Sequence, residues 1–314
     1  MKEVFCIGEL LIDFVAENQG SNLSLAREFT KKAGGAPANV ACAISKLGGK
    51  SAFIGCVGDD PFGTFLLEVL ENEDVNISLA QRSEIFTTLA FVSIDEDGER
   101  DFVFSRGADK ELKYHPEIKK NFNKNMVHFG AATALLGGNL EEAYGRFLFD
   151  AITQKAFISF DPNYRVDLWK NKTDLFVKKC MPFVEKSNLC KFSLEEARLI
   201  SGKENILEAS DFFHETGTQI VTITLGSEGT FVSSQNHSQT IPSIKVKPVD
   251  TTGAGDAFIG CLLKQISVLD KTDKVLSDTP VLYEMISMAN KAGALTTTNY
   301  GAIKSLPTQT QLNS

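Results

Sequence analysis

The stretch Asp250-Thr-Thr-Gly-Ala-Gly-Asp256, followed by the apolar run 257–263, is a glycine turn that opens a helix and carries a carboxylate just after its last glycine. Glycine tolerates positive φ, and the start of a helix offers unpaired N–H donors and the positive end of the dipole. We expect this turn to bind a phosphate, with Asp256 placed to accept a proton from a hydroxyl group. An ordinary helix cap with an acidic first turn would have the same sequence. Other motifs must distinguish the two.

Short apolar runs alternate with stretches of helical spacing along most of the chain. The apolar runs are 4–7, 52–57, 126–129, 156–160, 189–192 and 220–225, and the helical stretches include 37–47, 61–71, 140–153 and 173–184. Strands that are apolar throughout are buried on both faces, so this alternation predicts a mostly parallel central sheet between layers of helices. The expected fold class is α/β.

Two segments of the first third break this alternation. Residues 87–94 and 99–106, joined by Asp95-Glu-Asp-Gly98, have the pattern of a β-hairpin, and residues 11–30 look extended. Together they predict a small β-sheet, from about 11–32 and 86–107, that serves as a lid over the active face or as a dimer surface. Since no linker or repeat divides the chain, residues 1–314 are expected to form one catalytic domain.

Composition narrows the possible partners. The chain has 314 residues, 43% hydrophobic and 23% charged, as in an ordinary globular protein, and its net charge of -8 argues against nucleic acid. No stretch approaches transmembrane length and the first residues do not resemble a signal peptide, so we expect a cytoplasmic protein without a membrane partner. The six scattered cysteines are expected to be buried free thiols.

Gly34-Gly-Ala-Pro-Ala-Asn39 precedes a predicted helix. Its two glycines permit close approach of the backbone, and the Asn39 amide can both donate and accept hydrogen bonds, which suits a neutral polyhydroxyl ligand. A helix-opening turn without any ligand would also explain the motif.

Three further motifs each follow an apolar run. They are Asp161-Pro-Asn-Tyr-Arg165, Ser193-Leu-Glu-Glu196 and Thr224-Leu-Gly-Ser-Glu-Gly229. Ligands of open α/β sheets bind at the carboxyl ends of the strands, so these motifs are expected at one common edge. Ser193 and Glu196 form a capping-box pattern, and Glu196 is also a candidate for holding a hydrated Mg²⁺.

Taken together, these motifs resemble those of the ribokinase-like (PfkB) carbohydrate kinases. Residues 34–39 resemble the amino-terminal signature of that family and residues 250–256 its carboxyl-terminal signature, at the expected wide separation. The resemblance implies a ribokinase-like three-layer sandwich with a small β-sheet lid. It also implies transfer of the γ-phosphate of ATP to a hydroxyl of a small sugar.

The resemblance also implies roles for single residues. Asp256 would be the base, and the amides of Gly253, Ala254 and Gly255 would form the anion hole. Nucleotide-binding positions would be Thr224, Gly226, Gly229 and Asn290, and sugar-side positions would be Asp13, Gly34, Gly35, Asn39, Arg106, Asn163 and Arg165. Glu196 would bind Mg²⁺, although Ser193 stands where the family has asparagine. Asp250 and Thr252 resemble the K⁺ site of potassium-activated members.

Among subfamilies the chain looks most like bacterial fructokinases, so fructose is the expected sugar and fructose 6-phosphate the product. The 2-keto-3-deoxygluconate kinases share the Asp-Pro-Asn-x-Arg element, which leaves a sugar acid open, and aminoimidazole riboside is a more distant alternative. A catalytically silent sugar- or nucleotide-binding module is a different class of function. The apolar residues of the hairpin favour a homodimer formed through the lid.

Overall fold

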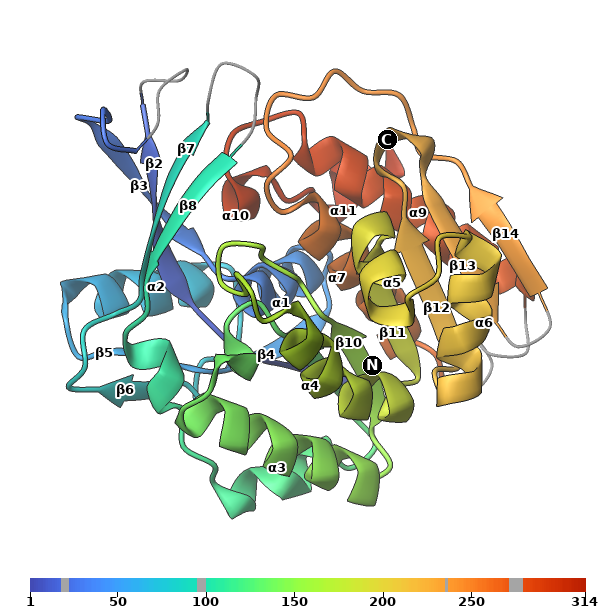
Figure 1. Ribbon diagram of the computed structural model, residues 1–314, viewed down its shortest axis with the longest axis horizontal. Helices are drawn as coiled ribbons and strands as arrows, with labels where there is room; N and C mark the ends of the chain where they lie inside the picture. The colour runs from blue at the N-terminus through green and yellow to red at the C-terminus, as the bar shows by residue number, and fades with distance from the viewer. Residues whose placement is uncertain (18–22, 95–99, 235–236, 271–278) are drawn as a thin grey trace.

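The computed structural model describes residues 1–17, 23–94, 100–234, 237–270 and 279–314, and its main feature is an eight-stranded sheet in the order β14-β13-β12-β11-β10-β9-β1-β4. The six strands from β12 to β4 pair in parallel, and β13 and β14 add an antiparallel edge (Figure 1). Its strands are β1 (Glu3–Ile7), β4 (Lys50–Ile54), β9 (Met126–Gly130), β10 (Phe157–Asp161), β11 (Leu189–Ser193), β12 (Ile220–Thr224), β13 (Thr230–Ser234) and β14 (His237–Ile241). The predicted α/β class with a mostly parallel sheet is confirmed.

Helices cover both faces of this sheet. One face carries α1 (Ala36–Lys46), α7 (Ala254–Ser267) and α9 (Thr279–Thr296), and the other carries α3 (Asn139–Thr153), α4 (Thr173–Lys186), α5 (Leu194–Ser201) and α6 (Ile206–Thr216). Alternate side chains of β1 divide between the two cores: Val4 and Cys6 pack with the first group of helices, Phe5 and Ile7 with the second. Successive side chains of a strand point to opposite faces, so both cores require an apolar strand.

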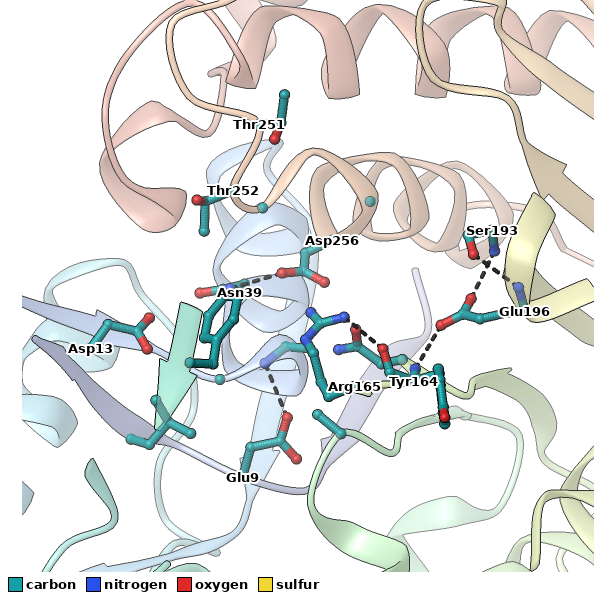
Figure 2. Close-up of a pocket in the computed structure, with 18 of the residues that line it drawn as sticks. Glu9, Asp13, Asn39, Tyr164, Arg165, Ser193, Glu196, Thr251, Thr252 and Asp256 are labelled. Atoms are coloured by element: carbon teal, nitrogen blue, oxygen red, sulfur yellow. Dashed lines mark hydrogen bonds between the residues drawn. The ribbon is translucent and has the colours of Figure 1, made fainter. Parts of the chain in front are cut away.

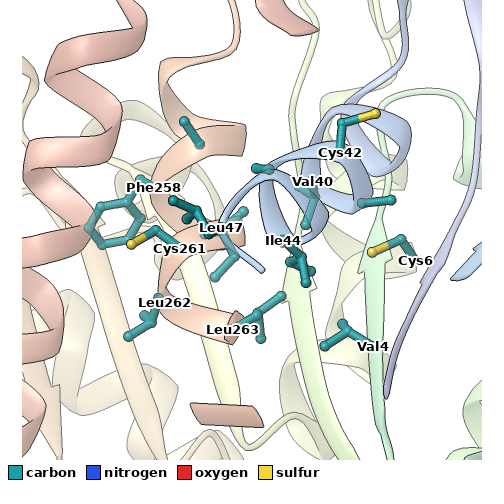
Figure 3. Close-up of a cluster of buried hydrophobic side chains, with 14 of the residues drawn as sticks. Val4, Cys6, Val40, Cys42, Ile44, Leu47, Phe258, Cys261, Leu262 and Leu263 are labelled. Carbon is teal, nitrogen blue, oxygen red and sulfur yellow. The ribbon is translucent and has the colours of Figure 1, made fainter. Parts of the chain in front are cut away.

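The helices that carry the two signature motifs pack directly on each other, as Figure 3 shows for Val40 and Ile44 of α1 beside Leu263 of α7. Gly260 permits this close contact, because a Cβ atom there would lie 2.5 Å from Cβ of Ala43. The start of α7 is thereby held beside the start of α1.

The small sheet has the order β3-β2-β7-β8 and projects away from the main body (Figure 1). Its strands are β2 (Leu11–Ala16), β3 (Phe29–Gly34), β7 (Leu89–Ile94) and β8 (Arg100–Ser105). The predicted hairpin strands are confirmed as the antiparallel pair β7 and β8, while their predicted turn, 95–98, lies outside the described residues. The segment 11–30, expected to be extended, contributes β2 and the first two residues of β3. Phe14 of β2 stacks on Phe91 of β7, with ring centroids 5.4 Å apart, and this contact helps to hold the two hairpins of the small sheet together.

The prediction of one strand over 52–57 is wrong. β4 ends at Ile54, and β5 (Cys56–Gly58) leaves the main sheet to pair with β6 (Gln81–Ser83). Gly55 marks the break, since a Cβ there would lie 2.5 Å from the carbonyl oxygen of Gly8. The close approach of another backbone at this point redirects the chain.

The remaining helices are short or peripheral: α2 (Pro61–Asn72), α10 (Ala302–Ser305), α11 (Gln309–Asn313), and the 3-10 turns η1 (Ala108–Glu111), η2 (Pro116–Phe122), η3 (Ala134–Leu136) and η4 (Gly226–Glu228). Over the described part of the chain, no helix has both the length and the apolar character needed to cross a bilayer. All six cysteines are free and buried, as expected.

Candidate active site

Two cavities meet at the start of α7. The first, of about 500 Å³, lies between the small sheet β3-β2-β7-β8, for which we keep the name lid, and the carboxyl ends of β10 and β11. The second, of about 560 Å³, lies beside β12 and α9. Thr251 and Gly255 line both. The predicted common edge is therefore present, since the motifs that begin at Asp161, Ser193 and Thr224 all start at the last residue of a strand of the main sheet. We call these the lid cavity and the β12 cavity.

The glycine turn holds the start of α7 in a conformation that requires glycine. Gly253 has φ 80° and ψ 0°, and a Cβ there would lie 2.7 Å from Cβ of Ala302. No side chain caps the helix, and the Ala254 N–H donates to the Thr251 carbonyl at 3.3 Å. An ordinary capped helix would turn a side chain back onto these amides, whereas here no side chain accepts from them and the first turn lines both cavities.

Asp256 instead binds the other signature motif. Its Oδ2 atom accepts a hydrogen bond from Nδ2 of Asn39 at 2.8 Å, across 217 residues of sequence, as the close-up in Figure 2 shows. Burial raises the pKa of Asp256 to about 6, although the Asn39 hydrogen bond opposes the rise. A carboxyl with this pKa is ionised at neutral pH and still basic enough to take a proton, which is the property of a general base.

Two residues that line the lid cavity carry polar atoms with no partner within the protein. Oδ1 of Asn39 and Nδ2 of Asn163 are buried and make no hydrogen bond, and both residues line the cavity. Buried polar atoms are nearly always paired in native proteins, so unpaired ones on residues that line a cavity favour a polar ligand there. One is an acceptor and the other a donor, which together suit hydroxyl groups.

The predicted sugar-side residues are not all at the cavity wall. Asp13, Gly35, Asn39, Asn163 and Arg165 line it, but Gly34 and Arg106 do not. Gly34 makes room for Asp13, because a Cβ at Gly34 would lie 2.0 Å from Oδ2 of that aspartate.

Arg106 does not line the cavity and donates through Nε to Oδ2 of Asp109 at 3.0 Å. Its Nη2 atom is buried without a partner.

Gly35 has φ 111°, and a Cβ there would lie 2.5 Å from the carbonyl oxygen of Glu9. Both glycines of the motif are thus required by close approach of other chain segments.

The β12 cavity has a wall of loop backbone and apolar side chains. Thr224, Gly226, Gly229 and Asn290 all line it, together with Ile244, Val246 and Phe258. Gly229 has φ 111°, and a Cβ there would lie 2.1 Å from the carbonyl oxygen of Ile241. A mostly apolar cavity beside a helix start suits a nucleotide base attached to phosphates.

Comparison of the chain with known protein families gives a match over nearly its whole length. The model for "pfkB family carbohydrate kinase" matches residues 1–309. The chain belongs to the pfkB carbohydrate kinase family. Its catalysed reaction is therefore transfer of a phosphoryl group to a sugar hydroxyl, and the predicted family and enzyme class are confirmed.

Individual relatives agree along nearly the whole chain. Probable fructokinase-4 of Arabidopsis thaliana is 36% identical, with 99% of this chain and 95% of the relative covered. The fructokinase of Xylella fastidiosa, solved with bound ATP, superimposes with a TM-score of 0.89 at 26% identity and covers 99% of this chain and 97% of that one. The fructokinase of Vibrio cholerae O395, solved with fructose, ADP and calcium ion, has a TM-score of 0.86 at 30% identity, covering 100% and 98%.

The predicted Mg²⁺ ligand of this pfkB kinase is engaged with backbone donors. Oε1 of Glu196 accepts from the Tyr164 N–H and Oε2 from the Ser193 N–H, both at 2.7 Å, while Ser193 completes the predicted capping box. Within the described ranges no group of three acidic, histidine or cysteine side chains gathers as a metal centre. This donor set fits an ion held chiefly by phosphates and water with one carboxylate nearby.

The predicted K⁺ residues lie at the turn before α7. Oδ1 of Asp250 accepts from the backbone and hydroxyl of Thr252 at 2.9 and 2.6 Å, and Oδ2 accepts from the Gly301 N–H at 2.9 Å. Asp250, Thr252 and Gly301 line a cavity of about 70 Å³. Asp250 therefore ties the turn to the segment before α10.

Asn290 has a contact that its predicted nucleotide role did not anticipate. Its Oδ1 accepts from the Thr230 hydroxyl at 2.6 Å, and its Nδ2 donates to the Ile241 carbonyl at 2.9 Å. The side chain ties α9 to β13 and β14, so Asn290 builds the wall of the cavity.

Two buried charged residues of the lid cavity were missed by the sequence interpretation. Glu9 accepts from the Ala36 N–H at 3.3 Å, and burial raises its pKa to about 7. Lys191 donates to Oδ2 of Asp161 at 2.9 Å. Glu9 follows an apolar run, like the motifs that were found, and Lys191 is a lone charge inside a buried strand. Both signals were present in the sequence.

Proposed function

We propose that this protein is an ATP-dependent fructokinase that transfers the γ-phosphate of ATP to fructose, giving fructose 6-phosphate. The observation that carries the proposal is the position of Asp256 at the junction of two cavities, one lined by residues with unpaired polar atoms and one that is mostly apolar. The names of its relatives support fructose as the sugar and ATP as the donor.

In this proposal the sugar lies in the lid cavity and ATP in the β12 cavity. Asp256 accepts the proton of the attacking hydroxyl as the oxygen–phosphorus bond forms, and the bond from phosphorus to ADP breaks. The backbone amides of Gly253, Ala254 and Gly255 stabilise the transferred phosphoryl group. These donors are preorganised by the helix, so they need no reorganisation during the reaction.

Hydroxyl recognition is assigned to Asp13, Asn39 and Asn163, whose polar side chains line the lid cavity. Gly34 makes room for the Asp13 side chain, Gly35 allows the backbone of Glu9 to lie close, and Arg165 lies at the cavity wall. Arg106 would act through its unpaired Nη2 atom. In the β12 cavity, Thr224, Gly226 and Gly229 would contact the nucleotide while Asn290 holds the wall.

Glu196 would hold Mg²⁺ through water, and Asp250 with Thr252 would hold K⁺. When bound, Mg²⁺ would neutralise part of the negative charge of the phosphates, which lowers the cost of bringing them together. The chain's own share is to place the carboxylates of Glu196 and Asp250 near the start of α7.

We further propose that the protein is cytoplasmic and dimerises through its lid. Val103 on β8 is 51% exposed and supports an apolar outer surface, whereas Phe102 and Phe104 are half-buried and line the lid cavity. Val103→Asp is expected to reduce the mass measured by sedimentation to that of a monomer. An unchanged mass would refute the lid interface.

The test of function is release of ADP by purified protein with Mg·ATP and a panel of sugars, with and without K⁺. Fructose should give the highest kcat/KM. A sugar acid such as 2-keto-3-deoxygluconate as best substrate would overturn fructose and point to a carboxylate bound by Arg165. Binding of ATP without turnover of any sugar would instead favour a silent binding module.

A further inference from the structure

Lys191 is a buried lysine inside an apolar strand. Only 8% of its surface is exposed, and its strand neighbours Cys190 and Phe192 are fully buried in the core. Its ammonium group donates to Oδ2 of Asp161 at the end of β10, and the side chain lines the lid cavity. The lysine therefore reaches out of the core toward the site.

The ammonium group lies against the start of α7. A Cβ atom at Gly255 would lie 3.1 Å from Nζ of Lys191, so glycine at this position leaves space for the lysine. Gly255 also lines both cavities. A cation and a helix start thus meet where the two cavities join.

The surroundings of Lys191 are strongly acidic. Burial alone would lower its pKa, but Asp161 and Glu196 raise it above the ordinary value, and Asp256 adds to the rise. Lys191 therefore stays protonated at neutral pH. The carboxylates of Asp161, Glu196 and Asp256 would repel a phosphate bound near them. A fixed ammonium group offsets part of that repulsion.

A purely structural role explains Lys191 less well. β10 and β11 are already joined by backbone pairing, and a buried ion pair is a weak means of stabilising a sheet, because desolvation offsets most of its attraction. Asp161 does, however, hold the ammonium group in a fixed position. Fixed donors in a dry site are most effective for charge that appears in a transition state.

We propose that Lys191 is a catalytic residue that donates a hydrogen bond to a non-bridging oxygen of the γ-phosphoryl group during its transfer. The assignment rests on the proposed kinase function and adds a side-chain donor to the backbone amides. In the step, the sugar oxygen bonds to phosphorus, the bond to ADP breaks, and the hydroxyl proton goes to Asp256. Lys191 remains protonated throughout and transfers no proton.

The test compares Lys191→Met, Lys191→Arg and Lys179→Met. Lys179 also forms an ion pair, with Glu141 at 2.6 Å, but lies outside both cavities, so its variant controls for loss of a partly buried charge. Loss of one preorganised donor is expected to lower kcat of Lys191→Met by about 10²–10³-fold. Its KM for fructose should change by less than about threefold, and Lys191→Arg should recover part of kcat.

Binding gives a readout that needs no turnover. If Lys191 contacts the γ-phosphoryl group, Lys191→Met should weaken adenylyl imidodiphosphate, which has a γ-phosphoryl group, and leave ADP affinity unchanged in calorimetry. Asp161→Asn keeps the ammonium group and should retain the preference for the triphosphate analogue. This measurement remains interpretable if fructose is not the sugar.

Equal weakening of ADP and of the analogue in Lys191→Met would overturn the proposal. So would a normal kcat in that variant, or an Asp161→Asn variant that copies its binding profile, since each would assign Lys191 to the ion pair alone. If Lys191→Met does not fold, Lys191→Arg and Asp161→Asn still separate the two roles. Absence of turnover in the wild type, with the triphosphate preference intact, would refute the sugar assignment and not this contact.

Discussion

Replacing Asn39 by alanine is expected to move the acid limb of kcat/KM to higher pH. Asn39 donates to Asp256 at 2.8 Å and stabilises its ionised form, which holds the pKa of that carboxyl down against the effect of burial. A base must be deprotonated, so activity is lost as the pH falls through this pKa. For the wild type the limb should therefore lie at about pH 6.

The size of the movement follows from the lost hydrogen bond. A hydrogen bond to a charged group contributes about 1.5–3 kcal/mol, and one pKa unit corresponds to about 1.4 kcal/mol. The limb of Asn39→Ala should therefore rise by about one to two pH units. The unpaired Oδ1 of Asn39 is also lost, so kcat/KM falls at every pH, but only the position of the limb reports on Asp256.

The assay is kcat/KM for fructose between pH 5 and 9 at constant ionic strength. Asp256→Asn should lower kcat by about 10²–10⁴-fold, abolish the limb and leave ATP affinity nearly intact. Asn125→Ala is a matched control, because Asn125 accepts from the Glu3 N–H at 3.0 Å far from both cavities and should leave the limb at its wild-type pH. A limb that stays in place in Asn39→Ala, or persists in Asp256→Asn, would refute Asp256 as the base.

Two glycine substitutions test the turns that line the cavities. Gly253→Ala puts a Cβ 2.7 Å from Ala302 at φ 80°, so it should reduce the free energy of unfolding in urea by about 1–3 kcal/mol and lower kcat. Unchanged values would show that the turn tolerates a side chain. Gly229→Ala, with a Cβ 2.1 Å from the Ile241 carbonyl, should raise KM for ATP more than KM for the sugar in steady-state kinetics, and the reverse order would contradict the nucleotide assignment.

Glu9→Gln should flatten the dependence of stability on pH. Burial raises the pKa of Glu9 from 4.5 to about 7, so between these values the folded state binds more protons than the unfolded state, and stability falls as pH rises. Unfolding in urea at pH 5 and pH 8 should show a smaller difference for the variant than for the wild type. An equal difference would mean that Glu9 ionises normally in the folded protein.

Much of the fold was predictable because its signals are local. Buried parallel strands are apolar throughout, and six such runs marked the parallel strands of the main sheet. The run 52–57 was misread because Phe53 and Val57 are equally apolar whether the strand continues or breaks. The cause of the break, backbone of Gly8 lying against Gly55, comes from a distant part of the chain.

The candidate site likewise has motifs that the local sequence predicts and contacts that only the tertiary structure sets. The turn 250–256 and the motif 34–39 predict phosphate and hydroxyl binding only in combination with the other motifs, although their glycines indicate positive φ and close backbone approach. That Asp256 turns to Asn39, and not back to its own helix, is decided by the packing of α7 on α1.

The sequence alone therefore determined the α/β class, the glycine turns and the order of polar motifs along one edge, since these depend on residue type and local spacing. Tertiary structure decided which polar groups face one another. It set Lys191 against Gly255, engaged Asn290 with β13 and β14, and left atoms of Asn39 and Asn163 unpaired. Burial and hydrogen bonding between distant segments set these contacts, and with them the pKa of Asp256, so no local pattern encodes them.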